Sequence, residues 1–430
     1  MIKPLRVGIA GLGTVGTGLM RILTEKNAVF ADRCGRPVTI SAVSVRDATK
    51  TRGYALPARF EASPVALADA DDVDLIVELM GGEGDPAYTL VKRALERGKP
   101  VVTANKALLS RHGMELAHLA EKKRVALNFE AAVAGGIPII KAIREALVAN
   151  RVHRLYGILN GTCNFILTEM TKSGRAFSDV LGEAQARGYA EADPTFDVGG
   201  LDAAHKLSLL AALAFGTEID LPGIHVEGIE KISPEDIQFA GELGYRIKLL
   251  GIARATDHGI EQRVHPTMVP ANSAIARIEG VTNAVMVEGS PVGNLAFEGP
   301  GAGSGATASA VAADIADIAR GSFNLPFIVP VARLKARQAS PIARHSGMSY
   351  VRLRVRDKAG VMAAITAVLA KYEVSIESLL QHGRAPGEAV SIVMTMHECP
   401  ETTVRAALDE IGRLDSVLAP PNFIRIESFA

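Results

Sequence analysis

One acidic segment combines residue types that could move a proton. Four acids fall within twelve residues, from Glu191 through Asp193 and Asp197 to Asp202, and Lys206 follows. On a helix, Asp202 and Lys206 share a face because residues four apart are neighbours, although many surface ion pairs have the same spacing. The residues after Lys206 (LSLLAALAF) are apolar on nearly every side, which predicts a buried helix. We therefore expect Lys206 to lie in a cleft, where it can serve as a general acid or base.

A second polar segment covers residues 160–165 (NGTCNF). Its residue types favour turns and could orient a small polar substrate. Cys163 could instead act as a nucleophile, as in an aldehyde dehydrogenase that forms a covalent intermediate. No histidine lies near Cys163 in the sequence, so a partner would have to come from elsewhere in the fold. Loss of activity on alkylation, prevented by substrate, would support that alternative.

A glycine-rich turn near the N-terminus predicts a dinucleotide site. Gly11, Gly13 and Gly16 form G-x-G-x-x-G between an apolar strand at 5–10 and a helical pattern at 17–26. The first glycine permits a tight turn, the second lets the backbone approach a pyrophosphate, and the third lets the helix pack closely. Free N–H groups at the helix N-terminus favour phosphate. The candidate cofactor-binding residues of this turn are Gly11, Leu12, Gly13, Thr14, Val15 and Gly16.

The end of the next predicted strand, residues 38–45, bears on cofactor choice. An acid there would favour NAD, but Val45 is followed by Arg46 and then Asp47. Arg46 is suited to a 2′-phosphate, which favours NADP or the use of both nucleotides. A solvated loop arginine is the plain alternative. Ten residues, 27–36, separate the predicted helix from this strand, so the register of the strand is not fixed by the glycine turn.

Apolar strands and helices alternate through the next part of the chain. We predict strands at 73–79, 100–103 and 125–130, and helices at 86–97 and 112–122. This alternation is typical of a parallel, doubly wound sheet, whose ligands bind beyond the carboxyl ends of the strands. We therefore expect three strand ends to share a rim with the glycine turn, and we assign Lys106 a substrate or cofactor role. These ends are residues 80–82, residues 103–106 and Glu130.

Small residues follow Glu130 as far as Pro138. Exposed backbone carbonyls beside a carboxylate suit a hard cation with oxygen ligands. From the residues alone, a plain turn is the simpler interpretation.

The composition narrows the functional class. The chain has 430 residues, 48% of them hydrophobic and 22% charged, so it folds, in roughly two to four domains. Lys plus Arg and Asp plus Glu both number 47, so there is no basic excess to favour nucleic acid. Cys34, Cys163 and Cys399 are too few for a disulfide framework or a zinc site, and the most apolar run (207–215) is too short to cross a bilayer. We expect a cytoplasmic protein with no membrane or nucleic-acid partner.

Four motifs occur together in one order: residues 11–16 (GLGTVG), 103–106 (TANK), 160–164 (NGTCN) and 191–206 (EADP…D…DAAHK). With them the chain resembles homoserine dehydrogenase of the bacterial type with a C-terminal ACT domain, over essentially its whole length. The resemblance implies NAD(P)-dependent interconversion of L-homoserine and L-aspartate 4-semialdehyde, a step in threonine, methionine and isoleucine biosynthesis. It implies that Lys206 is the acid/base, and no covalent intermediate at Cys163 is then needed.

The resemblance also implies site residues. Glu191 and Asp202 bind homoserine, Lys106 lies in the active site, and we add Asp197 as a substrate-binding candidate. A sodium ion is implied at Glu130, Val133, Gly135 and Ile137, mostly through backbone oxygens, which strengthens the cation interpretation. Further cofactor-binding candidates are Arg46, Thr103, Lys106, Gly188 and Gly303.

A late glycine-rich stretch covers residues 298–306, and an apolar helical pattern follows at 308–319. A flexible linker seldom leads directly into so apolar a helix. We therefore predict that this loop and helix pack back on the nucleotide domain.

The C-terminal segment has its own pattern. We predict strands at 349–356, 374–380, 389–396 and 423–426 and helices at 362–372 and 402–414, which is the βαββαβ order of a ferredoxin-like unit. With residues 357–361 (DKAGV) it resembles an ACT domain, a module that binds amino acids at paired interfaces. The implied ligand is threonine as a feedback inhibitor. A purely structural dimerisation module is the alternative.

Taken together, the patterns predict an α/β protein with a Rossmann-like doubly wound parallel sheet, an α+β catalytic domain and a ferredoxin-like ACT domain. We expect an NAD(P)-binding domain at 1–137 completed by about 300–322, a catalytic and dimerisation domain at 138–299, a connector at 323–347 and the ACT domain at 348–430. A homodimer or homotetramer is expected.

One alternative from another class is an amino-acid sensor with an inactive nucleotide domain. The presence of Glu191, Asp202 and Lys206 disfavours it. A lack of homoserine-dependent change in NADPH absorbance would support it.

Overall fold

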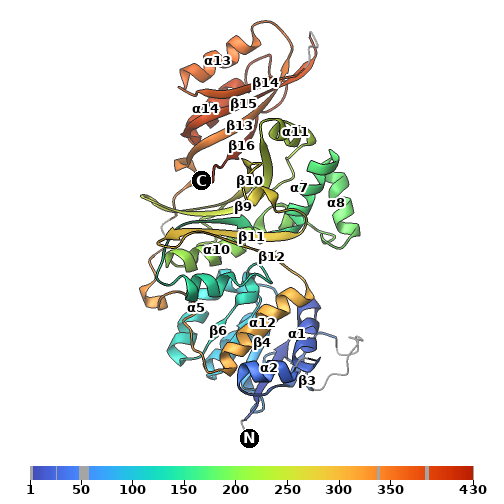
Figure 1. Cartoon of the computed structure of the whole chain (residues 1–430), viewed down its shortest axis with the longest axis vertical. Helices are drawn as coiled ribbons and strands as arrows, with labels where there is room; N and C mark the ends of the chain where they lie inside the picture. Colours follow the sequence, from blue (N-terminus) through green and yellow to red (C-terminus); the bar gives the residue numbers. More distant parts are fainter. Residues whose placement is uncertain (1–2, 26, 48–57, 337–338, 383–386, 430) are drawn as a thin grey trace.

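The computed structural model describes residues 3–25, 27–47, 58–336, 339–382 and 387–429. The elements are stacked in three tiers along the long axis (Figure 1). The N-terminal sheet is at the bottom, the strands β7 to β12 cross the middle, and the C-terminal unit lies at the top. Helix α12 (Ser304–Ala319) returns from the middle tier to lie beside α1 (Thr14–Glu25) at the bottom.

The N-terminal sheet is parallel throughout, in the order β3-β2-β1-β4-β5-β6. This is the doubly wound order whose ligand crevice lies where the strand order reverses, and it confirms the predicted fold class. Strand β1 is almost wholly buried because helices cover both faces of the sheet. The strands are β1 (Leu5–Ala10), β2 (Val38–Ser44), β3 (Arg59–Glu61), β4 (Leu75–Glu78), β5 (Val101–Thr103) and β6 (Leu127–Asn128). The other helices of this tier are α2 (Asn27–Cys34), α3 (Ala66–Asp69), α4 (Ala87–Glu96) and α5 (Lys106–Lys123).

Some element boundaries differ from the predicted ones. Residues 27–34, which had no predicted element, form α2, while residue 26 of the predicted first helix lies outside the described residues. Helix α5 begins at Lys106 rather than at 112, because the Asn105 side chain accepts a hydrogen bond from the Leu108 N–H and so caps the helix. The predicted strand at 125–130 shrinks to β6, because the chain turns into the 3₁₀ helix η1 (Glu130–Ala132).

Helix α12 packs directly against α1. A Cβ atom at Gly18 would lie 2.5 Å from the carbonyl oxygen of Ser304, so only glycine permits this approach. The Ser304 hydroxyl donates to the Thr14 carbonyl at 2.9 Å. The late helix therefore covers the helix that follows the glycine turn.

The middle tier is a sheet with α10 (Leu201–Phe215) packed on it. Most of α10 is buried, as its apolar sequence predicts. The strands are β7 (Arg151–Ile158), β8 (His225–Val226), β9 (Tyr245–Thr256), β10 (Gly259–Pro270), β11 (Thr282–Ser290) and β12 (Gly293–Pro300). The remaining helices are α6 (Ile139–Lys141), η2 (Ala142–Ala146), α7 (Gly161–Ser173), α8 (Phe177–Ala186), α9 (Thr195–Val198), α11 (Pro234–Glu242) and η3 (Ile275–Arg277).

The C-terminal unit has the predicted βαββαβ order. After the short turns η4 (Val331–Arg333) and η5 (Ile342–Arg344), its elements are β13 (Ser346–Arg356), α13 (Val361–Lys371), β14 (Ile376–Gln381), β15 (Ala389–Pro400), α14 (Glu401–Ile411) and β16 (Asn422–Ile426). Unexpectedly, its sheet is continuous with that of the middle tier. Strand β16 pairs in parallel with β10 through Thr267↔Arg425 and Met268↔Ile426. The joint sheet runs β12-β11-β7-β9-β10-β16-β13-β15-β14.

Buried charges join the two units at this seam. Arg425, which is 1% exposed, donates to Glu401 at 2.7 Å and to Glu227 at 3.1 Å. Arg263 donates to Glu261 at 2.7 Å and to Glu427 at 2.6 Å. Each guanidinium has carboxylate partners, and breaking one such buried pair would leave a costly unpaired charge.

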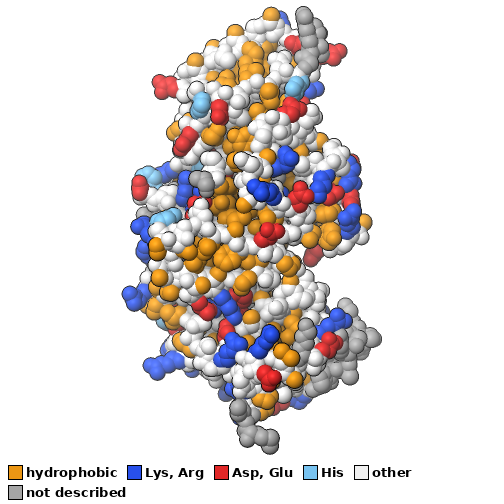
Figure 2. All heavy atoms as spheres, in the orientation of Figure 1, with side chains coloured by type: hydrophobic (Ala, Val, Ile, Leu, Met, Phe, Trp, Pro, Cys, Tyr) orange, Lys and Arg blue, Asp and Glu red, His pale blue; other side chains and the backbone are white. Residues whose placement is uncertain are grey.

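The surface agrees with the neutral composition. Figure 2 shows basic and acidic side chains interspersed over one face, with hydrophobic side chains gathered across its middle. Among the described residues, none of the helices combines the length and the apolar character that a membrane crossing requires.

Candidate active site

A cavity of about 540 Å³ lies between the N-terminal tier and the middle tier. Residues from segments far apart in the chain line it. These include Val15 in the glycine turn, Lys106 on α5, and Asp202 and Lys206 on α10. The remaining lining residues used below are Gly135, Asn160, Gly161, Thr162, Gly188, Asp197, Asn283, Gly301, Gly303 and Thr307.

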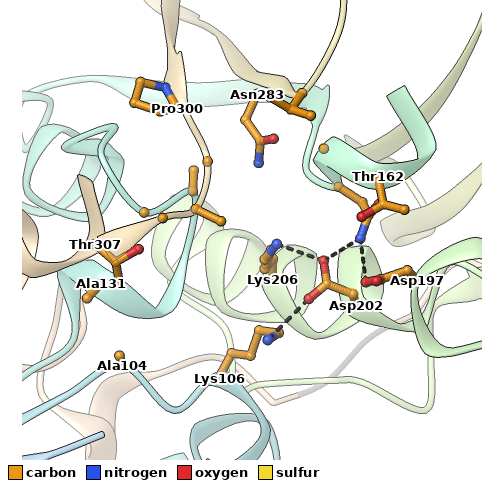
Figure 3. Close-up of a pocket in the computed structure, with 18 of the residues that line it drawn as sticks. Ala104, Lys106, Ala131, Thr162, Asp197, Asp202, Lys206, Asn283, Pro300 and Thr307 are labelled. Carbon is orange, nitrogen blue, oxygen red and sulfur yellow. Dashed lines mark hydrogen bonds and ion pairs between the residues drawn. The ribbon is translucent and has the colours of Figure 1, made fainter. Parts of the chain in front are cut away.

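Asp202 is bonded to two lysines at the base of this cavity (Figure 3). The Lys206 Nζ donates to Asp202 Oδ2 at 2.7 Å, and the Lys106 Nζ lies 3.1 Å from Oδ1. Lys206 also donates to the Leu159 carbonyl at 2.7 Å. Burial would raise the pKa of Asp202, but the charges of Lys206 and Lys106 outweigh it and hold that pKa well below its usual range. The carboxylate is therefore ionised and fixes both ammonium groups at the cavity.

Asn160 is the N-cap of α7 and holds two acids together. Its side chain accepts from the Cys163 N–H at 2.8 Å, and its Nδ2 donates to Asp197 and to Asp202, each at 2.8 Å. Burial, and then the charge of Asp202, raise the pKa of the Asp197 carboxyl. The polar segment at 160–165 was predicted to orient groups, but Asn160 itself was not among the candidate site residues. The sequence feature that could have identified Asn160 as a site residue is the N-G-T-C-N motif at residues 160–164.

The glycine turn borders a second cleft of about 940 Å³. Gly11 has φ +98°, and a Cβ there would lie 2.7 Å from the Leu79 carbonyl oxygen. A Cβ at Gly16 would lie 2.3 Å from the Gly11 carbonyl oxygen, so this residue must be glycine for the turn to close. At Gly13 nothing lies within 4 Å of such a Cβ, so the space beside it is open to a ligand. Arg46 lines the same cleft, at the end of β2.

The rim of the sheet is organised by an acid that the sequence analysis did not single out. Glu78, fully buried at the end of β4, accepts from the Thr103 hydroxyl at 2.6 Å and from the Met80 N–H at 2.7 Å. Burial raises the pKa of its carboxyl. The sequence feature that could have identified Glu78 is its position as an acid within the apolar run at residues 73–79 (VDLIVEL). The Thr103 side chain, a predicted cofactor contact, is buried and directed to Glu78.

Three family models match the chain. The model for the NAD-binding domain of homoserine dehydrogenase matches residues 11–130. The model for homoserine dehydrogenase itself matches residues 138–316, and the model for the ACT domain matches residues 349–416. A homoserine dehydrogenase of Neisseria gonorrhoeae is 46% identical over 433 residues, 99% of each chain. The chain belongs to the homoserine dehydrogenase family. It is an oxidoreductase with an NAD-binding domain and an ACT domain.

Other homoserine dehydrogenases are similar to this chain over all or most of its length. The one from Pseudomonas aeruginosa is 44% identical over 434 residues, 99% of each chain. The crystal structure of the one from Thiobacillus denitrificans is 44% identical, covers 99% of each chain and superposes with a TM-score of 0.93. A hyperthermophilic archaeal homoserine dehydrogenase in complex with NADPH is 26% identical, with a TM-score of 0.64, over 75% of this chain and all of that one.

Not every residue predicted from the homoserine dehydrogenase resemblance faces the cavity. Gly188 and Gly303 line it, each with a positive φ, as do Asp197, Asp202, Lys106 and Lys206. Glu191, by contrast, is exposed and is not among the lining residues. Its proposed contact with homoserine stays a prediction.

Cys163 is placed unfavourably for a nucleophile. It is fully buried, its thiol donates to the Asp197 carbonyl at 3.2 Å, and burial raises the pKa of the thiol well above its usual value. A buried thiol with a raised pKa supplies little thiolate. The structure therefore disfavours the Cys163-dependent alternative.

The predicted cation loop is buried beside the cavity. The Glu130 carboxylate accepts from the N–H groups of Ile140 and Lys141 at 2.9 and 2.8 Å. Ala134 and Gly135 both have positive φ, which turns the backbone sharply here. Burial and the neighbouring Asp314 raise the pKa of Glu130 to about 7. Within the described part of the chain, no three His, Cys, Asp or Glu side chains cluster as metal ligands.

Proposed function

We propose that the protein interconverts L-homoserine and L-aspartate 4-semialdehyde with NADP or NAD, and that Lys206 is the general acid/base. The observation that carries this proposal is the Asp202 carboxylate, which holds Lys206 and Lys106 at one cavity beside the nucleotide cleft. The reaction fits the family to which the chain belongs. It would serve the biosynthesis of threonine, methionine and isoleucine.

Lys206 moves the proton. In the oxidation of homoserine, the neutral amine form of Lys206 accepts the proton of the side-chain hydroxyl, and in the reverse direction its ammonium form donates a proton to the aldehyde oxygen. The hydrogen bond that Nζ donates to Asp202 keeps it in position throughout, and a second one to the Leu159 carbonyl restrains it from another direction. The bound nicotinamide supplies the hydride acceptor or donor.

The remaining charged groups orient the substrate. Asp202 has both oxygens engaged by lysines and by Asn160, so Asp197 is the better acceptor for the α-ammonium within the cavity. Lys106 supplies a second positive charge beside the reacting centre. Glu191 is proposed to contact homoserine as well, by resemblance.

The cleft at the glycine turn fits a dinucleotide. The open space beside Gly13 and the N-terminus of α1 suit a pyrophosphate. Arg46 at the end of β2 suits a 2′-phosphate, so we propose NADP as the favoured cofactor. Gly188 and Gly303 leave room where the reactive end of the cofactor would meet the substrate.

The loop from Glu130 to Ile137 fits a structural sodium ion. The donor set is one carboxylate together with backbone carbonyls, which are ligands that a hard cation prefers. The raised pKa values of Glu130 and Asp314, about 7 and about 6, reflect two buried acids that a nearby cation would favour in ionised form. Glu130, Val133, Gly135 and Ile137 would hold the ion, which would fix the loop that lines the cavity at Gly135.

The ACT domain is proposed to carry threonine feedback in a homodimer or homotetramer. Its sheet is continuous with the catalytic sheet through β10 and β16, which offers a direct route for coupling. The hydrophobic side chains gathered across the middle of one face are consistent with self-association.

One assay tests this proposal. Initial rates of nucleotide reduction are measured with homoserine and either NADP or NAD, with and without threonine. We expect turnover that depends on homoserine, a higher kcat/KM with NADP, and inhibition by threonine. No homoserine-dependent rate with either nucleotide would overturn the activity, and a rate unchanged by threonine would overturn the feedback alone.

A further inference from the structure

A second cavity, of about 300 Å³, lies where the C-terminal unit meets the middle tier, and we call it the seam cavity (Figure 1). Arg154 on β7 and Arg254 on β9 line it from the middle tier. Glu377 on β14 and Glu398 on β15 line it from the C-terminal unit. None of the described residues that line it also lines the cavity at Lys206. Side chains of both charges therefore border a cavity that the proposed reaction does not use.

Two β-bulges open the C-terminal sheet at the seam cavity. Strand β15 has two residues, His397 and Glu398, opposite the single residue Met348 of β13. Glu377 is the extra residue of β14 where its pairing with β15 shifts. All four residues line the seam cavity. Bulges interrupt the ladder and redirect side chains, and they are frequent beside functional sites.

Two nitrogen atoms of the lining residues have no hydrogen-bond partner among the described residues. His345 is 3% exposed, with Nδ1 at 3.4 Å from the Glu261 carboxylate and Nε2 unpaired. Arg254 donates to the same carboxylate from Nη2 at 3.4 Å, and its Nε–H is unpaired. A carboxylate only accepts, so Nδ1 carries the proton of the neutral ring and Nε2 is an acceptor. One buried acceptor and one buried donor thus lie beside Glu261, and leaving them unpaired is costly.

The charge around Arg254 favours a further anion. Arg254 lies directly opposite Arg154 in the pairing of β9 with β7. Arg154 donates to Glu288 at 2.7 Å, whereas Arg254 reaches Glu261 only at 3.4 Å. Like charges that face each other across two strands destabilise a sheet. A ligand carboxylate beside Arg254 would offset this repulsion.

We infer that the seam cavity binds a small α-amino acid, and that threonine acts on the enzyme from this site. The ligand carboxylate accepts from the Arg254 Nε–H, while the ammonium donates to His345 Nε2 and is attracted by the Glu377 carboxylate. The two charged groups of an α-amino acid are bonded to one carbon, and Arg254 and His345 likewise contact one carboxylate. The inference rests on the proposed threonine feedback and places it between the two units rather than at a paired interface of ACT domains.

Strand β7 connects the seam cavity with the proposed active site. Arg154 lies on this strand, and the chain continues from its end at Ile158 to Leu159 and Asn160. The Leu159 carbonyl accepts from Lys206. A ligand that shifts β7 would therefore displace a partner of the proposed acid/base.

The test is the binding of L-threonine to the full chain, measured by isothermal titration calorimetry. Arg254→Met removes the charge and every N–H donor, while Arg263 still donates to Glu261 at 2.7 Å. Glu377→Gln removes the acid that faces the ammonium. We expect the Kd for threonine to rise about tenfold or more in each variant. Without threonine, kcat/KM for homoserine should stay within about twofold of the wild type.

Two exposed residues of the C-terminal unit supply matched controls. Arg413→Met and Glu373→Gln should leave the threonine Kd unchanged. A wild-type Kd in either seam variant would overturn the inference, because a site at residues 357–361 would be left intact. A wild-type protein that binds no threonine at millimolar concentration would overturn it as well.

The outcomes also separate this inference from the proposed activity. If Arg254→Met does not fold, Glu377→Gln, at an exposed position, decides the question by itself. A wild-type protein without homoserine-dependent turnover would overturn the proposed activity. Threonine binding that both seam variants lose would then still establish the seam site.

Discussion

Asp202 and Lys206 lie one turn apart on α10 and are joined by a hydrogen bond of 2.7 Å at the edge of the cavity. The Lys206 side chain is 12% exposed, so its ammonium reaches the cavity while its stem is packed against the protein. A short bond to an ionised carboxylate fixes Nζ in one position. The position of a proton-transfer group relative to the reacting atom governs how much it accelerates the reaction.

Replacement of Lys206 tests its role. We expect Lys206→Ala to lower kcat by about 10²–10⁴-fold, because the general acid/base is lost. Binding of NADPH, followed by fluorescence titration, should persist, since Lys206 does not line the nucleotide cleft. Lys231→Ala, at an exposed lysine, serves as the control. Unchanged turnover in Lys206→Ala would refute the assignment.

Replacement of Arg46 tests the cofactor preference. Arg46→Ala should lower kcat/KM with NADP by about tenfold or more, because a charge-assisted hydrogen bond to phosphate is lost. The value with NAD should change little. Arg97→Ala, at a surface arginine paired with Asp69, is the matched control. If both nucleotides are affected equally, Arg46 does not read the 2′-phosphate.

Sodium should stabilise the protein through the loop that begins at Glu130. At a sodium concentration ten times the Kd, a single site adds about 1.4 kcal/mol of stability. The unfolding temperature should therefore rise in sodium chloride relative to choline chloride of equal ionic strength. Glu130→Gln should abolish that difference. Equal melting temperatures of the wild-type protein in the two salts would argue against the site.

The charged seam between β10 and β16 should make stability sensitive to acid. Burial alone would raise the pKa of Glu227, but hydrogen bonds from His225 and Arg425 outweigh it and hold this pKa at about 2. The folded value lies below the ordinary 4.5, so the stabilisation is complete above about pH 4.5 and is lost as the pH falls through about 2. Glu227→Gln should cost about 1–2 kcal/mol at pH 7, after allowance for solvent screening. Its urea midpoint should then depend less on pH than that of the wild type between pH 5 and 2.

The control for this experiment is Glu96→Gln, at an exposed position of α4. It should leave both the midpoint and its pH dependence unchanged. A Glu227→Gln variant that follows the wild-type pH profile would show that Glu227 does not couple proton binding to folding.

Local patterns specified much of this molecule. The glycine turn at 11–16 must close tightly whatever surrounds it, so its spacing alone predicts the cofactor cleft. The apolar helix after Lys206 predicts that Asp202 and Lys206 share a buried face, because helical periodicity is a property of the adjacent residues. The parallel sheet and the βαββαβ order of the C-terminal unit follow from the same kind of regularity.

Other features depend on contacts between distant segments. Asn160 binds Asp197 and Asp202, 37 and 42 residues away, and Lys106 reaches Asp202 from another domain. No periodicity marks Asn283, which lies beside Gly161 and Gly301 although both are far from it in the sequence or on another element. The pairing of β10 with β16 likewise has no local signal. Such contacts arise from packing between elements that are remote in the chain. They do not require any regular spacing of residues in the sequence, so no local pattern predicts them.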